Sequence, residues 1–100
     1  MAGNRIQLWG KVLVAPELRT TPAGTSVLRI IVQAGDGSPD FALAVTMTGE
    51  AARQVGARLK AGIEVTVKGS LKAVRRKTKS AIIETAYEVV ADSIDLKLSD

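Results

Sequence analysis

The chain has 100 residues, 46% of them hydrophobic, and 14 Lys and Arg against 10 Asp and Glu give it a formal net charge of +4. This length fits a single domain over residues 1–100, and the absence of Cys and His excludes disulfide scaffolds, thiolate or imidazole metal sites and His-based acid–base catalysis. The apolar runs are too short for a membrane-spanning helix and the N-terminus lacks a signal-peptide core, so we expect a cytoplasmic protein without membrane contact.

Strand patterns dominate the first half of the chain. Apolar and polar residues alternate over residues 5–14, which predicts a long first strand. The following APELRTTPAGTS contains two prolines and a glycine and predicts a turn or an irregular connection. The nearly continuous apolar run in residues 26–35 is typical of a strand buried on both faces, and Asp36-Gly37 is the expected hairpin turn after it.

A third strand and one helix occupy the middle of the chain. The strand is predicted over residues 41–47, and the helix over 50–61, with Thr48 as its N-cap and Gly62 just past its end. Three apolar residues of the helical segment are expected to face the core, namely Ala52, Val55 and Leu59.

Two further strands complete the pattern. Residues 63–72 alternate most clearly, and they predict a strand with one buried face. The last strand, over residues 83–98, changes its apolar phase near Asp92 and Ser93, which indicates a bulge or a bend.

The predicted order of elements is three strands, a helix and two strands. This is the order of the OB-fold, so the expected class is all-β with one short helix, in a five-stranded Greek-key barrel, although periodicity alone leaves other small barrels open. Barrel closure also explains Gly10 and Gly69, which occupy core-facing positions where a strand bends sharply or another backbone comes close.

Positive charge is concentrated before the last strand. Six basic residues lie between Glu64 and Glu84 without an acidic one, and 8 basic residues face 10 acidic ones elsewhere. In an OB-fold the turn between the fourth and fifth strands contacts oligonucleotides, so a mobile basic loop here predicts phosphate binding. A loop that binds a protein partner, or a merely solvated tip, is the alternative. The candidate nucleic-acid-binding residues are Lys68, Lys72, Arg75, Arg76, Lys77 and Lys79, with Lys11, Arg19, Arg29 and Phe41 in addition.

Several of these residues have a second interpretation. Arg29 could reach a groove or pair with a carboxylate, and Phe41 could stack a base or pack in the core. Trp9 lies on the polar face of the first strand with Arg5 and Gln7, where a Trp could stack a base, pack against other side chains or be buried at a dimer interface. Tyr87 is expected to cap the barrel. With three aromatic residues in the chain, we expect binding that is mainly electrostatic and depends steeply on salt.

The segment LWGKVLVAPELRTTPAGTSVLRI resembles the bacterial single-stranded DNA-binding protein family. GEAARQVGARLKAGIEVTVKGSL is similar to a second signature of that family, so the resemblance spans nearly the whole chain. It implies an OB-fold that binds single-stranded DNA. The matching positions are Leu8, Gly10, Glu17, Leu18, Arg19, Pro22, Gly24, Val27, Gly49, Leu59, Gly62, Val65, Val67, Gly69 and Leu71.

Departures from the family pattern limit the resemblance to one group of its members. Where members stack bases on aromatic side chains, this chain has Ser38, Ala42, Thr48 and Arg76, and it stops at Asp100 without the family's acidic tail. The opening NRIQLWG and the ending VVADSIDL are similar to the primosomal members of the family, which consist of the bare domain.

The primosomal resemblance implies a homodimer of replication restart that binds single-stranded DNA, the primosomal helicase and helicase-loading proteins. We found no catalytic motif, and we expect neither an enzyme nor a cofactor. A divergent, tail-less general single-stranded DNA-binding protein and a protein-only adaptor with a basic loop are the alternatives. The residues do not separate DNA from RNA, because both offer phosphates and stackable bases.

Overall fold

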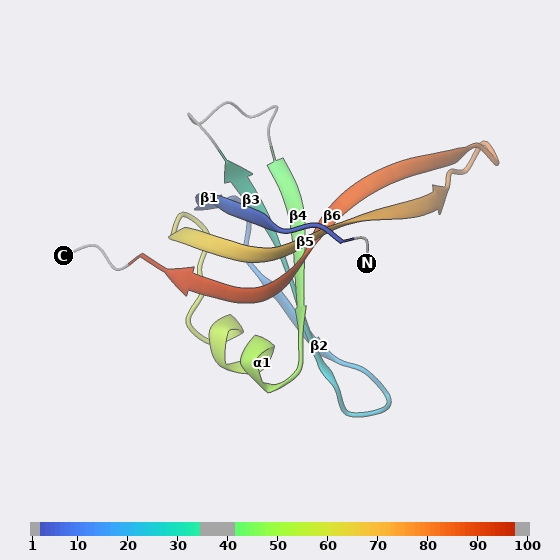
Figure 1. Cartoon of the computed structure of the whole chain (residues 1–100). Helices are drawn as coiled ribbons and strands as arrows, with labels where there is room; N and C mark the ends of the chain where they lie inside the picture. The colour runs from blue at the N-terminus through green and yellow to red at the C-terminus, as the bar shows by residue number, and fades with distance from the viewer. Residues whose placement is uncertain (1–2, 35–41, 98–100) are drawn as a thin grey trace.

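Six strands and one short helix make up the computed structural model, which describes residues 3–34 and 42–97 (Figure 1). The predicted turn at Asp36-Gly37 and the predicted start of the third strand at Phe41 lie outside these residues. The elements are β1 (Ile6–Val12), β2 (Glu17–Thr20), β3 (Ser26–Ala34), β4 (Ala42–Thr48), α1 (Glu50–Gly56), β5 (Glu64–Lys77) and β6 (Ile83–Leu96).

Five of the strands close into a barrel. The sheet runs in the order β1-β5-β6-β4-β3-β2, and an additional pairing of β1 with β3 closes the ring and leaves β2 outside it. The β4–β6 pair is parallel and the other pairs are antiparallel. A closed five-stranded Greek-key barrel with one helix between β4 and β5 is the OB-fold, as the order of elements predicted.

The barrel interior is filled by the side chains of each strand that point inward. Along β3 every second residue from Leu28 to Ala34 is buried, and the residues between them are half-buried. The expectation that this strand is buried on both faces was therefore wrong, because its second face lies on the outside of the barrel. The largest fully buried side chains are Leu28, Ile30, Val12, Val32, Val45, Val65, Val67 and Val89.

The segment expected to be an irregular connection contains a strand. Residues 17–20 form β2, which pairs with β3 from Glu17↔Arg29 to Thr20↔Ser26. A turn closes this hairpin, where Thr21 Oγ1 accepts a hydrogen bond from the backbone N–H of Thr25 at 3.1 Å. The two prolines flank the strand instead of interrupting it, so they do not prevent the ladder.

The helix is shorter than predicted. Thr48 is the last residue of β4 and not the N-cap, which is Gly49 with a φ of 92°. The helix ends at Gly56, and Gly62 instead forms part of the turn before β5. A Cβ at position 56 would lie 3.3 Å from Leu28 Cδ1, so this glycine lets the helix approach the barrel closely. The three residues predicted to face the core do so: Ala52 and Leu59 are buried, and Val55 packs against them partly buried.

Gly10 and Gly69 mark two places where another backbone approaches a barrel strand closely. A Cβ on Gly10 would lie 2.0 Å from the carbonyl oxygen of Gln33, and one on Gly69 would lie 2.0 Å from that of Val90. The register of β5 with β6 shifts between Lys68 and Gly69, because Asp92 is an extra residue in β6. The close backbone approach and the bulge near Asp92 are both confirmed.

Candidate nucleic-acid interface

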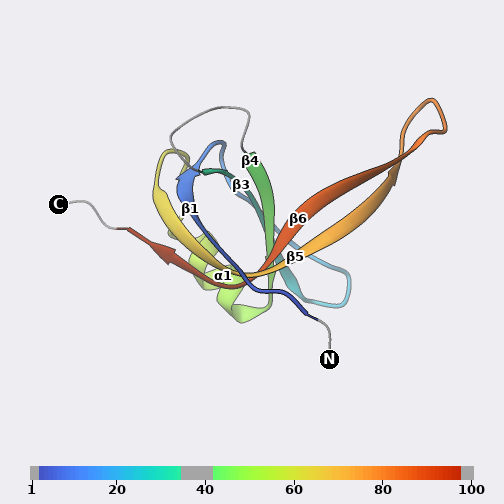
Figure 2. The same cartoon turned by 45° about the horizontal axis from the view of Figure 1, so that its top comes forward.

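The β5–β6 hairpin continues beyond the barrel as a two-stranded ribbon. Figures 1 and 2 show it projecting away from the other strands. The ladder is unbroken from Gly69↔Ala91 to Lys77↔Ile83. With a rise of about 3.4 Å per residue, the part from Leu71 to Lys77 is about 20 Å long. We call residues 71–77 and 83–88 the ribbon.

The basic segment lies mostly on a strand and not on a loop. Arg75, Arg76 and Lys77 belong to β5, so only Lys79 lies in the turn. The expected mobile basic loop was therefore wrong for three of the four residues. The turn is held by Thr78, whose N–H donates to the carbonyl of Ile82 at 2.8 Å, and by Ala81, which has a positive φ of 61°.

Because side chains alternate along a strand, the ribbon has two different faces. Cross-strand partners share a face, so the register assigns each position. We call the first face, which continues the inward phase of the barrel, the basic face: it comprises Leu71, Ala73, Arg75, Lys77, Ile83, Thr85 and Tyr87. We call the second the mixed-charge face: it comprises Lys72, Val74, position 76, Glu84, Ala86 and Glu88.

The two faces differ in charge and exposure. On the basic face, the partner of Arg75 is Thr85 and that of Lys77 is Ile83, so neither cation has an acidic residue opposite. On the mixed-charge face, Lys72 lies opposite Glu88 and position 76 opposite Glu84. All residues of the basic face are exposed, whereas Val74, Ala86 and Glu88 of the other face are half-buried. The charge excess that the sequence indicated is thus concentrated on one face of the ribbon.

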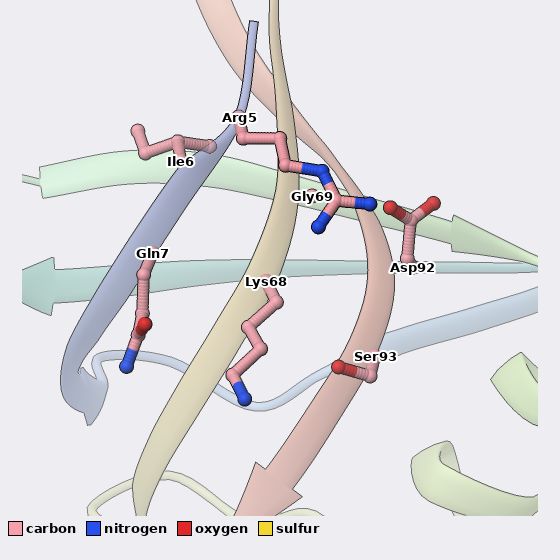
Figure 3. A pocket seen from close by; sticks show the side chains of 7 residues that line it. All are labelled: Arg5, Ile6, Gln7, Lys68, Gly69, Asp92 and Ser93. Atoms are coloured by element: carbon pink, nitrogen blue, oxygen red, sulfur yellow. The ribbon is translucent and has the colours of Figure 1, made fainter.

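Lys68 lies at the base of the ribbon, beside an open groove. The groove has a volume of about 340 Å³ and lies where β1, β5 and β6 meet. Figure 3 shows the Arg5 side chain extending toward Asp92 across Gly69. The Asp92 carboxylate makes this groove a poorer phosphate site than the basic face of the ribbon. Its lining residues are Arg5, Ile6, Gln7, Lys68, Gly69, Asp92 and Ser93.

The other predicted DNA-binding residues lie away from the ribbon. Lys11 lies opposite Glu64 in the β1–β5 ladder, at the other end of β5. The Oε2 atom of Glu64 is 3.4 Å from Lys97 Nζ. Arg19 is exposed on β2. Arg29 lies opposite Glu17 and is half-buried, so a carboxylate is its cross-strand neighbour.

Phe41 lies outside the described residues, as does the side chain of Arg76, and the DNA-binding role predicted for either one stays a prediction.

The outward face of β1 carries the residues predicted for a dimer interface. Arg5, Gln7 and Trp9 are all exposed, and Trp9 reaches 63% exposure beside its cross-strand partner Thr66. The ladder with β5 runs from Ile6 to Lys11, but the ladder with β3 begins only at Gly10. Within the described chain, the second backbone edge of residues 6–9 therefore faces no other strand.

Two residues near the ribbon base lie in surroundings that the sequence did not predict. Asn4 Nδ2 donates to the carbonyl of Leu71 at 3.1 Å, and Leu71 N–H donates to Asn4 Oδ1 at 2.6 Å, so this side chain extends the β1–β5 ladder. Tyr87 is 57% exposed and does not belong to the barrel core, so its expected role as a barrel cap was wrong. The sequence carried no signal for these surroundings, because both depend on the register of distant strands.

Among the described residues, no three His, Cys, Asp or Glu side chains lie close enough to hold a metal ion. The one described helix is far too short to cross a membrane.

Comparison with known proteins connects this architecture to a family. No curated protein matches the chain. The model of the single-strand binding protein family matches residues 3–97, which covers the barrel and the whole ribbon. A closed OB barrel whose last two strands continue as an exposed basic ribbon fits the binding of single-stranded DNA. The chain belongs to the single-strand binding protein family.

Proposed function

We propose that the protein binds single-stranded DNA through the ribbon and acts as an accessory factor of the replication-restart primosome. The observation that carries the DNA-binding part is the face with Arg75 and Lys77, where two exposed cations have no acidic cross-strand partner. Guanidinium and ammonium groups in this setting hold phosphates without reading a base sequence. Lys79 in the turn and Lys72 on the second face extend the positive potential.

A titration against salt tests this proposal. Labelled oligo-dT, its RNA equivalent and a duplex are each titrated at several salt concentrations. The parent should prefer single strands, with a salt slope of about −0.7 per phosphate contacted. The double variant Arg75→Ala/Lys77→Ala should bind more weakly with a shallower slope.

A matched variant controls for net charge. Arg58→Ala/Lys60→Ala removes two exposed cations from the segment between α1 and β5 and should bind like the parent. Equal losses in the two double variants would mean that net charge alone governs binding. A parent slope near zero would refute electrostatic binding altogether.

The primosomal role rests on the resemblance of both ends of the chain to the primosomal members of the family. In this proposal the protein is a homodimer that also binds the primosomal helicase and helicase-loading proteins. Dimerisation is supported by the exposed Trp9 and by the edge of residues 6–9, which pairs with no second strand among the described residues, since strand addition at such an edge is a common mode of association.

Light scattering tests the dimer. The expected mass is twice the chain mass of 10.5 kDa, and Trp9→Lys should shift it toward the monomer. A tetramer that coats long strands cooperatively would favour a general single-stranded DNA-binding protein.

Binding of the primosomal helicase is measured with and without saturating oligo-dT. This tests whether DNA and the helicase displace each other from the protein. Competition is expected if the two ligands share a basic surface. Helicase binding that saturating DNA leaves unchanged would rule out a shared surface.

A further inference from the structure

The basic face of the ribbon combines its two cations with an aromatic ring. Tyr87 lies opposite Ala73, two pairs of residues closer to the barrel than Arg75↔Thr85, so the two pairs are neighbours on the same face. At 57% exposure, its ring is among the most exposed apolar groups of the chain, together with Trp9, Ile82 and Ile83. The residue directly opposite the ring is small, because Ala73 has the smallest side chain that a strand can place there without a glycine.

A structural role does not account for this exposure. Tyr87 is neither in the core cluster nor among the partly buried residues packed against it. A large apolar ring that is more than half exposed contributes little to folding, since the stabilisation scales with the area removed from water. An exposed aromatic among cations is, in contrast, the usual composition of a single-strand binding surface.

We propose that Tyr87 is a base-stacking platform, and that Arg75 and Lys77 hold the phosphates of the nucleotides next to the stacked base. This inference deepens the proposed function and rests on it. One face of the ribbon then holds both parts of a nucleotide: the ring contacts the base, and the two cations continue along the same face toward the tip. The mixed-charge face holds exposed or half-buried residues with acids opposite its cations, and it contributes less to binding.

The test compares oligo-dT with an abasic oligonucleotide of the same length, which offers the phosphates without the bases. Tyr87→Leu should lower the affinity for oligo-dT about 5- to 150-fold, the range for loss of one stacked base. It should leave the abasic affinity and the salt slope unchanged, because no charge is removed. Tyr87→Phe keeps the aromatic face and should bind both oligonucleotides like the parent.

A charge variant on each face completes the design. Arg75→Ala should weaken binding of both oligonucleotides and reduce the salt slope, whereas Lys72→Ala should do so less. The removal of Lys60, which lies outside the ribbon, should leave both affinities unchanged.

A direct readout of the ring is available because the chain contains one Tyr. Protein labelled with 3-fluorotyrosine gives a single ¹⁹F resonance, which should shift on addition of oligo-dT and much less with the abasic strand.

The outcomes separate this inference from the proposed function. If the parent binds oligo-dT and Tyr87→Leu binds it equally well, the stacking role is refuted while DNA binding stands. If Tyr87→Leu weakens both oligonucleotides equally, or changes the mass measured by light scattering without DNA, the ring supports the fold or a subunit contact and the inference is overturned. If the parent binds no oligonucleotide at low salt, the proposed function fails and this inference fails with it.

Discussion

The two halves of the β5–β6 hairpin share one ladder and have opposite surroundings. Inside the barrel, Val65, Val67 and Val89 are almost completely buried. In the ribbon, Ile83 and Tyr87 lie on the same strand as Val89, and both are more than half exposed. A two-stranded ribbon is marginally stable alone, so the barrel half must hold the register of the exposed half. The barrel end of the two strands thus supports the fold, and the exposed end carries the proposed binding surface.

The largest expected difference between the halves concerns stability. Ile94 and Ile83 are both on β6, and they are 5% and 65% exposed. Ile94→Ala should lower the free energy of unfolding by about 2–5 kcal/mol, because it leaves a cavity in the core. Ile83→Ala should change it by less than about 0.5 kcal/mol. Chemical denaturation of both variants measures the contrast, and equal losses would mean that the ribbon packs against something in solution.

The boundary between the halves is tested at Gly69. A Cβ there would lie 2.0 Å from the carbonyl oxygen of Val90, so Gly69→Ala must displace backbone and should cost about 1–3 kcal/mol. Gly3 has no heavy atom within 4 Å of the corresponding position, and Gly3→Ala is the matched control with an expected effect near zero. If both variants are as stable as the parent, the bulge does not fix the start of the ribbon.

A smaller effect is expected where Asn4 attaches the N-terminal segment to the ribbon base. Asn4→Ala removes both hydrogen bonds to Leu71 and should cost about 0.5–1.5 kcal/mol, toward the lower end because the site is exposed. Asn4→Asp keeps the acceptor and loses the donor, so its cost should be intermediate. Hydrogen exchange of the Leu71 amide should accelerate in the same order, and an unchanged rate would contradict the anchoring role.

The smallest effect is expected for the ion pair between Glu50 and Arg53 on α1. Here the cation has an acidic partner, which Arg75 and Lys77 lack. Neither of the ion pairs found among the described side chains lies on the ribbon. The hydrogen bond from Arg53 lowers the pKa of Glu50 below its usual value of 4.5. A lowered folded-state pKa means that the pair stabilises the protein above pH 4.5, and that this contribution is lost as the pH falls through the folded-state pKa.

The pH dependence of Glu50→Gln checks this sign. The variant should unfold at a slightly lower denaturant concentration than the parent at pH 7, and the difference should vanish at acid pH. The effect is small because both side chains are more than 60% exposed and screened by solvent. A difference that grows on acidification would contradict the assigned direction.

Local patterns in the sequence were sufficient to predict the barrel. The alternation in β5 predicted its buried face, the phase change at Asp92 predicted the bulge, and Gly10 and Gly69 predicted close backbone contacts. These features follow from the period of a strand and from the space that a missing Cβ leaves, and both are properties of a short stretch of chain.

Features that depend on distant partners could not be predicted in this way. The segment 17–20 is a strand because β3 offers it an edge, and the helix ends early where the chain turns toward β5. The basic run was predicted to be a loop, because the sequence does not reveal that residues 83–86 continue the ladder opposite it.

The sequence by itself determined the fold class, which side chains of the barrel strands face the core, and where along the chain the positive charge lies. Only the tertiary structure decided how that charge is divided between two faces, because a cation's opposite neighbour depends on the register of β5 with β6. Arg75 and Arg76 are adjacent in the chain, yet one lies opposite Thr85 and the other opposite Glu84. The strand period of two separates them, and the cross-strand pairing assigns a threonine to the first and a carboxylate to the second.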